Sequence, residues 1–180
     1  MLHIRVAGGT HAGLLLTIIP TITMAILLTG GTGKTSTRIA SLLRARNIHF
    51  LLASRNLPIS SSLSRPHVIF DWTDHTTWPK AFTQPIEAVY MMEPQVAQPW
   101  VPMISFLDFA ISKGVKRFVL CAGTTAERGK DGMGRVWDAF VEKEVEFCVL
   151  RPSWFMGMCP GANHGTDRDC FNDLNADCPT

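Results

Sequence analysis

The sequence has almost no excess of charge of either sign, since its 180 residues include 17 lysines and arginines against 15 aspartates and glutamates. This balance gives no reason to expect a nucleic acid or an anionic membrane as a partner, because both attract a cationic surface. The five cysteines are scattered and form no Cys-x-x-Cys pair. Neither a disulfide framework nor a zinc ribbon is therefore indicated. A reducing, cytoplasmic setting is the simplest expectation.

A long apolar run is also missing. The apolar stretch at residues 14–19 is interrupted by Pro20 and is too short to span a bilayer. It is consistent with a weak signal peptide, but Met24 stands one residue before the first predicted strand, where a compact nucleotide-binding domain would begin. We interpret residues 1–23 as an atypical N-terminal extension and expect no membrane partner.

The chain is organised around a glycine cluster. An apolar run over residues 25–29 ends at Gly30, and a helical pattern with Ile39, Leu42 and Leu43 on one face follows. Strand, glycine turn and helix in this order are typical of dinucleotide-binding folds. The glycines allow the backbone to approach a pyrophosphate, and the helix N-terminus attracts the anion.

Two alternatives to a dinucleotide site stay open at this cluster. The spacing is Gly30-x-x-Gly33-x-x-Ser36, so a serine replaces the usual third glycine. Gly33-Lys34-Thr35 resembles the end of a triphosphate-binding P-loop, but that motif needs a glycine where this chain has Leu28. A glycine-rich turn without any ligand is the other alternative.

Five further apolar runs alternate with helical patterns. The runs cover residues 50–53, 68–70, 88–92, 117–121 and 146–150, and the helical patterns cover residues 34–46, 76–82, 101–112 and 133–143. Continuously apolar strands that alternate with helices predict a parallel sheet covered on both faces. The predicted fold class is therefore α/β, a Rossmann-like doubly wound parallel sheet, over residues 24–156.

No acidic residue occurs from Ala25 to Phe70. Enzymes that prefer NAD place a carboxylate after the second strand for the ribose 2′-hydroxyl, whereas an arginine there accommodates the 2′-phosphate of NADP. This chain has Ser54-Arg55 at that point. We therefore predict NADP(H) as the cofactor, with a solvated surface arginine as the alternative.

The residues predicted to bind the cofactor follow the first four strands, because ligands bind beyond the carboxyl ends of parallel strands. They are Gly30, Thr32, Gly33, Lys34, Thr35, Ser54, Arg55, Asp71 and Met91. Asp71 can accept a hydrogen bond from the adenine amino group or can instead cap the following turn. Met91 would flank a ribose, although a methionine at a strand end is more often part of the core. Thr124 follows the fifth strand, beside the expected nicotinamide.

Tyrosine is almost absent. The single tyrosine, Tyr90, lies inside a predicted strand, so the Tyr-x-x-x-Lys acid of short-chain dehydrogenases is excluded. Reduction of a carbonyl group needs such a proton donor, whereas a cationic C=N⁺ group needs only hydride, because its nitrogen becomes neutral. The absence is consistent with iminium reduction and equally with no catalysis.

Five segments in order resemble one family. They are MAILLTGGTGKT (24–35), LASR (52–55), FDW (70–72), KGVKRFVL (113–120) and LRPSWFM (150–156). The family is that of the fungal festuclavine/agroclavine dehydrogenases, ergot alkaloid enzymes within the NmrA-like atypical short-chain dehydrogenases. The resemblance implies NADPH-dependent reduction of a cyclic iminium, formed from chanoclavine-I aldehyde, to a tetracyclic clavine alkaloid. It also implies that Thr124 is the small hydroxyl near the nicotinamide, the one candidate catalytic residue.

Residues 157–180 depart from this family, whose members continue with further helices and strands. The segment is rich in Gly, Asp, Asn and Cys, and Cys159, His164, Cys170 and Cys178 fit no standard metal-ligand spacing. We predict an irregular tail without a metal site and a C-terminally incomplete sheet, for which a shifted reading frame or a retained intron is the hypothesis. The favoured function is a truncated iminium reductase. The alternatives are a non-catalytic NADP(H)-sensing regulator and a defective product without a stable fold.

Overall fold

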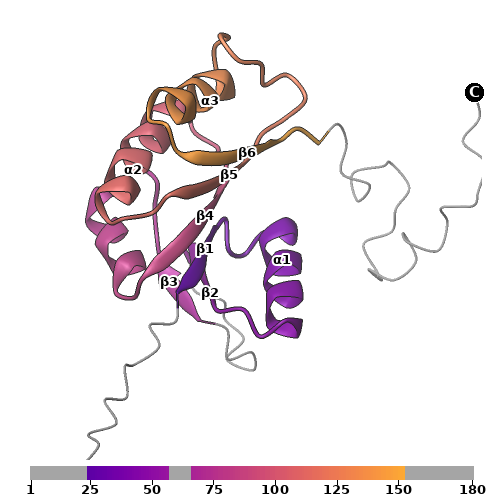
Figure 1. The fold of residues 1–180 in the computed structure, drawn as a ribbon, viewed down its shortest axis with the longest axis vertical. Coiled ribbons are helices and arrows are strands. Elements are labelled where there is room, and N and C mark those ends of the chain that lie inside the picture. Colours follow the sequence, from indigo (N-terminus) through magenta and orange to yellow (C-terminus); the bar gives the residue numbers. More distant parts are fainter. Residues whose placement is uncertain (1–23, 57–65, 153–180) are drawn as a thin grey trace, which may run out of the picture.

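Six parallel strands form the centre of the computed structural model, which describes residues 24–56 and 66–152 (Figure 1). The features predicted for residues 1–23 and 157–180 lie outside the described residues. So do the last residues of the predicted 24–156 domain.

Strands and helices alternate along the chain as the apolar pattern predicts. The strands are β1 (Ala25–Thr29), β2 (Phe50–Ser54), β3 (His67–Ile69), β4 (Ile86–Met92), β5 (Arg117–Cys121) and β6 (Glu146–Leu150). The helices are α1 (Lys34–Ala45), the 3₁₀ helix η1 (His75–Phe82), α2 (Trp100–Ser112) and α3 (Met133–Glu142). Every predicted element is present, and its bounds differ from the prediction by at most two residues.

The strands lie in the order β3-β2-β1-β4-β5-β6. The side on which the chain adds new strands changes next to β1. Residue Leu27 of β1 stands beside Leu51 of β2 on one side and Val89 of β4 on the other. The chain leaves β1 toward β2 but later returns to add β4 on the opposite side. This reversal creates a crevice at the carboxyl ends of β1 and β4, the usual ligand site of open α/β sheets.

Helices cover both faces of the sheet, with α1 on one face and α2 and α3 on the other (Figure 1). The larger core lies on the α2 and α3 face and centres on Phe106, whose ring meets Phe70, Trp72 and Trp78 edge-on at centroid distances of 5.1–5.3 Å. Leu27 and Leu28 are both fully buried, on opposite faces, because successive side chains of a strand alternate.

The face of α1 that packs on the sheet differs from the prediction. Ile39 and Leu43 pack against the core as expected, but the side chain of Leu42 is 57% exposed. The buried positions of the helix are Ser36 and Ala40, two small residues one turn apart. Because Ser36 and Ala40 face the sheet, Leu42 lies about half a turn away, on the opposite side of the helix. The small side chains allow α1 to lie close to β1.

Strand β6 forms an edge of the sheet and remains largely exposed. Of its five residues only Val149 is partly buried, and Leu150 is 43% exposed. Its face on the α1 side has no helix over it among the described residues (Figure 1).

Candidate functional site

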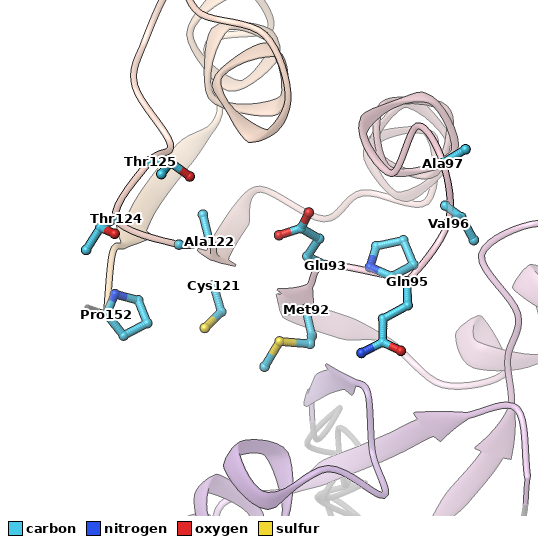
Figure 2. Close-up of a pocket in the computed structure, with 12 residues that line it drawn as sticks. Met92, Glu93, Gln95, Val96, Ala97, Cys121, Ala122, Thr124, Thr125 and Pro152 are labelled. Carbon is cyan, nitrogen blue, oxygen red and sulfur yellow. The ribbon is translucent and has the colours of Figure 1, made fainter. Parts of the chain in front are cut away.

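Two adjoining cavities occupy the crevice at the carboxyl ends of the strands. The loop-side cavity, about 440 Å³, lies between the turn after β1, the end of β2 and the segment after β4. The β5-side cavity, about 630 Å³, lies between the segment after β4 and the loop after β5 (Figure 2). The two share residues 92–96, so together they form one continuous groove.

The turn after β1 lies so close to β2 that side chains are excluded there. Gly30 has a φ of +63°, a conformation that favours glycine. The Gly31 amide donates to the carbonyl of Ala53 at 2.9 Å. A Cβ at Gly31 would stand 2.9 Å from the backbone nitrogen of Ala53. The two glycines thus permit the backbone approach that the spacing predicts.

Ser36 stands at the third position of the glycine pattern and explains why a serine is acceptable there. Its side chain is fully buried, and its hydroxyl donates to the Thr29 carbonyl at 2.7 Å. This bond ties the first turn of α1 to the end of β1. A larger side chain would separate the helix from the strand.

Thr29 fastens the end of β1 to β4. Its hydroxyl donates to the Tyr90 carbonyl at 2.9 Å and accepts from the Met92 amide at 2.8 Å, and its side chain is fully buried. These bonds fix the floor of the groove where the two strands diverge. The sequence analysis did not single out Thr29, although a threonine that ends an apolar strand before a glycine turn is a recognisable signal.

The start of α1 is open to a ligand. Its N-cap residue, Gly33, has an extended backbone and offers no side-chain hydrogen bond, and no acidic residue lies in the first turn. The first amides of the helix therefore retain their capacity to bind an anion. Lys34 and Thr35 line the loop-side cavity beside them.

The end of β2 supplies a second cation to this cavity. Arg55 lines it and forms no ion pair with any residue in the described ranges. Ser54 also lines it, but its hydroxyl donates to the Asn56 carbonyl at 2.7 Å and so belongs to the turn. Of the residues predicted to bind a cofactor, Gly30, Thr32, Gly33, Lys34, Thr35, Ser54 and Arg55 line this one cavity.

Asp71 and Met91 are not among the residues that line the groove. The Asp71 carboxylate accepts from the amide and the hydroxyl of Thr73 at 2.9 and 2.8 Å, which is the turn-capping alternative. Met91 is fully buried in the core on the α2 and α3 face. Their neighbours line the cavity instead, Trp72 at the β3 end and Met92 in the middle.

Thr124 lines the β5-side cavity, together with other residues of the loop after β5 (Figure 2). Its backbone carbonyl accepts from the Arg151 guanidinium, which ties this loop to the end of β6. Cys121 lines the same cavity.

Tyr90 is unsuited to act as an acid. Its hydroxyl is buried and finds no hydrogen-bond partner, and Tyr90 is not among the residues that line either cavity. Burial, followed by the neighbouring Cys121 thiol, raises the pKa of the phenol above its usual value. The hydroxyl therefore stays protonated at physiological pH.

Glu93 is a further residue of the groove, at the strand end where side chains are expected to flank a ribose of the cofactor. It follows β4 directly and lines both cavities. Figure 2 shows its side chain extending away from that of Met92, between Ala122 and Ala97. Desolvation raises the pKa of its carboxyl above the usual value. Its position immediately after a strand is the sequence signal that points to it.

Within the described ranges, no group of three or more His, Cys, Asp or Glu side chains is placed to hold a metal ion. The same part of the chain contains no helix with the length and hydrophobicity needed to cross a bilayer.

The strand order, the glycine turn at the reversal point and the open helix N-terminus define a Rossmann-type nucleotide-binding fold. The chain is 40% identical over 139 residues to the agroclavine dehydrogenase of Claviceps purpurea (strain 20.1). It is 42% identical over 142 residues to festuclavine synthase I of Penicillium roqueforti (strain FM164). These alignments cover 74% of this chain and 47% and 48% of the relatives. The predicted resemblance is confirmed, and the chain spans about half the length of the curated relatives it matches.

Solved structures confirm the fold class. The triphenylmethane reductase of Citrobacter sp., complexed with NADP(H), superposes with a TM-score of 0.63 at 17% identity, covering 74% of this chain and 51% of that one. Yeast methylglyoxal/isovaleraldehyde reductase Gre2, complexed with NADPH, gives a TM-score of 0.55 at 15% identity, covering 74% and 57%. At these identities the likeness shows the fold alone. No family model matches the chain.

Proposed function

We propose that residues 24–156 form the NADPH-binding part of an oxidoreductase that reduces a cyclic iminium to a clavine alkaloid. The names of the relatives support an oxidoreductase of alkaloid metabolism. The missing Tyr-x-x-x-Lys pair supports a substrate that needs hydride without a proton. The observation that carries the proposal is the loop-side cavity, which combines a glycine cradle, free helix amides and two cations.

The residues present fit such a cofactor. Gly31 lets the turn approach β2, Gly30 and Gly33 line the cavity without a side chain, and the amides at the start of α1 would bind the pyrophosphate oxygens. Lys34 adds a positive charge at the same place. When bound, a reduced nicotinamide supplies the hydride. The chain's own role is to hold the cofactor at the carboxyl ends of the strands.

Arg55 is the residue that we expect to select NADPH over NADH. It lines the cavity without an ion-pair partner among the described residues, and neither Asp nor Glu precedes it from Ala25 onward. A guanidinium matches a 2′-phosphate through paired hydrogen bonds. A carboxylate at this point would instead favour the 2′-hydroxyl of NADH.

A thermal-shift titration with NADPH and NADH tests the cofactor assignment. A ligand that binds only the folded chain stabilises it by about 2.7 kcal/mol at a concentration a hundred times its dissociation constant. We expect Arg55→Glu to weaken NADPH by roughly 10- to 100-fold and to leave NADH nearly unchanged. Arg46→Glu, an equal charge change on an exposed residue outside the groove, is the control. Equal losses for both cofactors would contradict the role of Arg55.

Turnover is the second test. NADPH oxidation, followed by absorbance, is measured with a cyclic iminium and with an aldehyde of similar size. Reduction of the iminium without reduction of the aldehyde supports the proposal. Tight NADPH binding with no turnover of either compound would favour the non-catalytic NADP(H)-sensing alternative.

A further inference from the structure

Charged side chains are unevenly distributed along the groove. Lys34 and Arg55 line the loop-side cavity alone, at the glycine turn and after β2, whereas Glu93 lines both cavities. Glu93 is the one Asp, Glu, Lys or Arg residue that lines the β5-side cavity. A ligand that spans the groove therefore meets two cations and Glu93 in the loop-side cavity, but only the Glu93 carboxylate in the β5-side cavity.

Glu93 has no basic partner within the described ranges. Some carboxylates there are paired, such as Glu87 and Glu146 with Arg117, whereas others, such as Glu142, are not. Glu93 forms no ion pair within these ranges, and it is an exposed residue where it lines the two cavities. An exposed carboxylate without a basic partner is available to a cationic ligand. None of the other side chains that line the β5-side cavity is cationic.

We propose that Glu93 recognises the positive charge of the substrate in the β5-side cavity and thereby selects a cyclic organic cation over a neutral ring of the same shape. This inference rests on the proposed function, because it assumes that the reaction takes place at this end of the groove. The carboxylate extends away from the side chain of Met92 at the wall of the β5-side cavity (Figure 2), the cavity in which we expect the substrate ring to bind. Its negative charge attracts a cation and repels an anion.

Binding without turnover tests the proposal. The 180-residue chain is saturated with NADP⁺, and isothermal calorimetry measures the binding of N-methyl-3,4-dihydroisoquinolinium and of its neutral all-carbon isostere. We expect Glu93→Gln to weaken binding of the cation by about tenfold, the effect of losing one partly solvated charge–charge contact, because this cation has no N–H to donate. The neutral isostere and NADP⁺ should change less than about twofold. Glu93→Asp, which keeps the charge, should restore part of the affinity, and Glu142→Gln, exposed on α3, should have no effect.

Several outcomes would overturn the proposal. They are an equal loss for the cation and its isostere, no loss for either, and no binding of the cation to the wild-type chain with NADP⁺ bound. A loss confined to NADP⁺ would instead assign Glu93 to a ribose of the cofactor. Failure of NADP⁺ to bind the wild-type chain, seen in the same titrations, would reject the proposed function itself. Iminium reduction that survives Glu93→Gln unchanged would reject the inference alone.

Discussion

Replacing Thr29 with valine removes the two hydrogen bonds that fasten β1 to β4, without leaving a cavity. Valine has nearly the same shape, but it can neither donate to the Tyr90 carbonyl nor accept from the Met92 amide. Each bond contributes about 0.5–1.5 kcal/mol net, and an amide left unpaired costs about 1–3 kcal/mol. We therefore expect Thr29→Val to lower the free energy of unfolding by about 2–4 kcal/mol, or the midpoint temperature by roughly 10–20 °C.

Urea unfolding measures this change. The fluorescence of Trp72 and Trp78, both buried in the core, reports on the folded state. Thr37→Val is the matched control, because the Thr37 hydroxyl bonds only to carbonyls of its own helix turn and is exposed. We expect the control to change the free energy of unfolding by less than about 0.5 kcal/mol. A Thr29→Val loss below about 1 kcal/mol, or one equal to the control, would refute the assigned role.

Two further predictions concern stability. Gly134→Ala should lower the free energy of unfolding in urea by more than about 3 kcal/mol, because a Cβ there would stand 2.1 Å from the Glu127 carbonyl oxygen. Gly129→Ala should lower it by only about 1 kcal/mol, because the φ of Gly129 is +75° but no atom lies within 4 Å of the added Cβ. Equal losses for the two variants would contradict the contact at Gly134. Burial raises the pKa of the Glu93 carboxyl above the usual 4.5, so the folded chain holds this proton more tightly than the unfolded chain. The resulting stabilisation is complete below about pH 4.5 and is lost as the pH rises through the folded-state pKa. The stability of Glu93→Gln relative to wild type should therefore increase from pH 4 to pH 8 in the same assay, and a difference independent of pH would argue against the raised pKa.

Elements whose signals are local could be predicted from the sequence. Strands β1, β5 and β6 have the predicted bounds, because each is a largely apolar run of residues that are adjacent in the chain. Helix α2 ends at Ser112, two residues before Gly114, whose φ of +89° suits a helix C-terminus. The glycine turn belongs to this group as well, since its residues are adjacent in the chain.

Which side of a strand faces the groove could not be predicted with the same success. Met91 and Met92 are neighbours of identical type, yet Met91 is in the core and Met92 lines both cavities. Their pairing with Leu120 and Cys121 on β5 sets this alternation. A shift of one residue would exchange the two faces. The buried face of α1 was mispredicted at Leu42 for a related reason, because the small residues Ser36 and Ala40 decide how the helix approaches the sheet.

The sequence by itself determined the order of the strands and helices, the glycine turn and the clustering of seven predicted ligand residues in one cavity. These depend on short-range spacing and on the rule that parallel strands bring their carboxyl ends to one edge. Only the tertiary structure decided that Thr29 joins β1 to β4, that Met92 rather than Met91 lines the groove, and that Glu93 lines both cavities. These features depend on contacts between residues far apart in the chain and on the direction of each side chain. Composition and periodicity do not encode either of these.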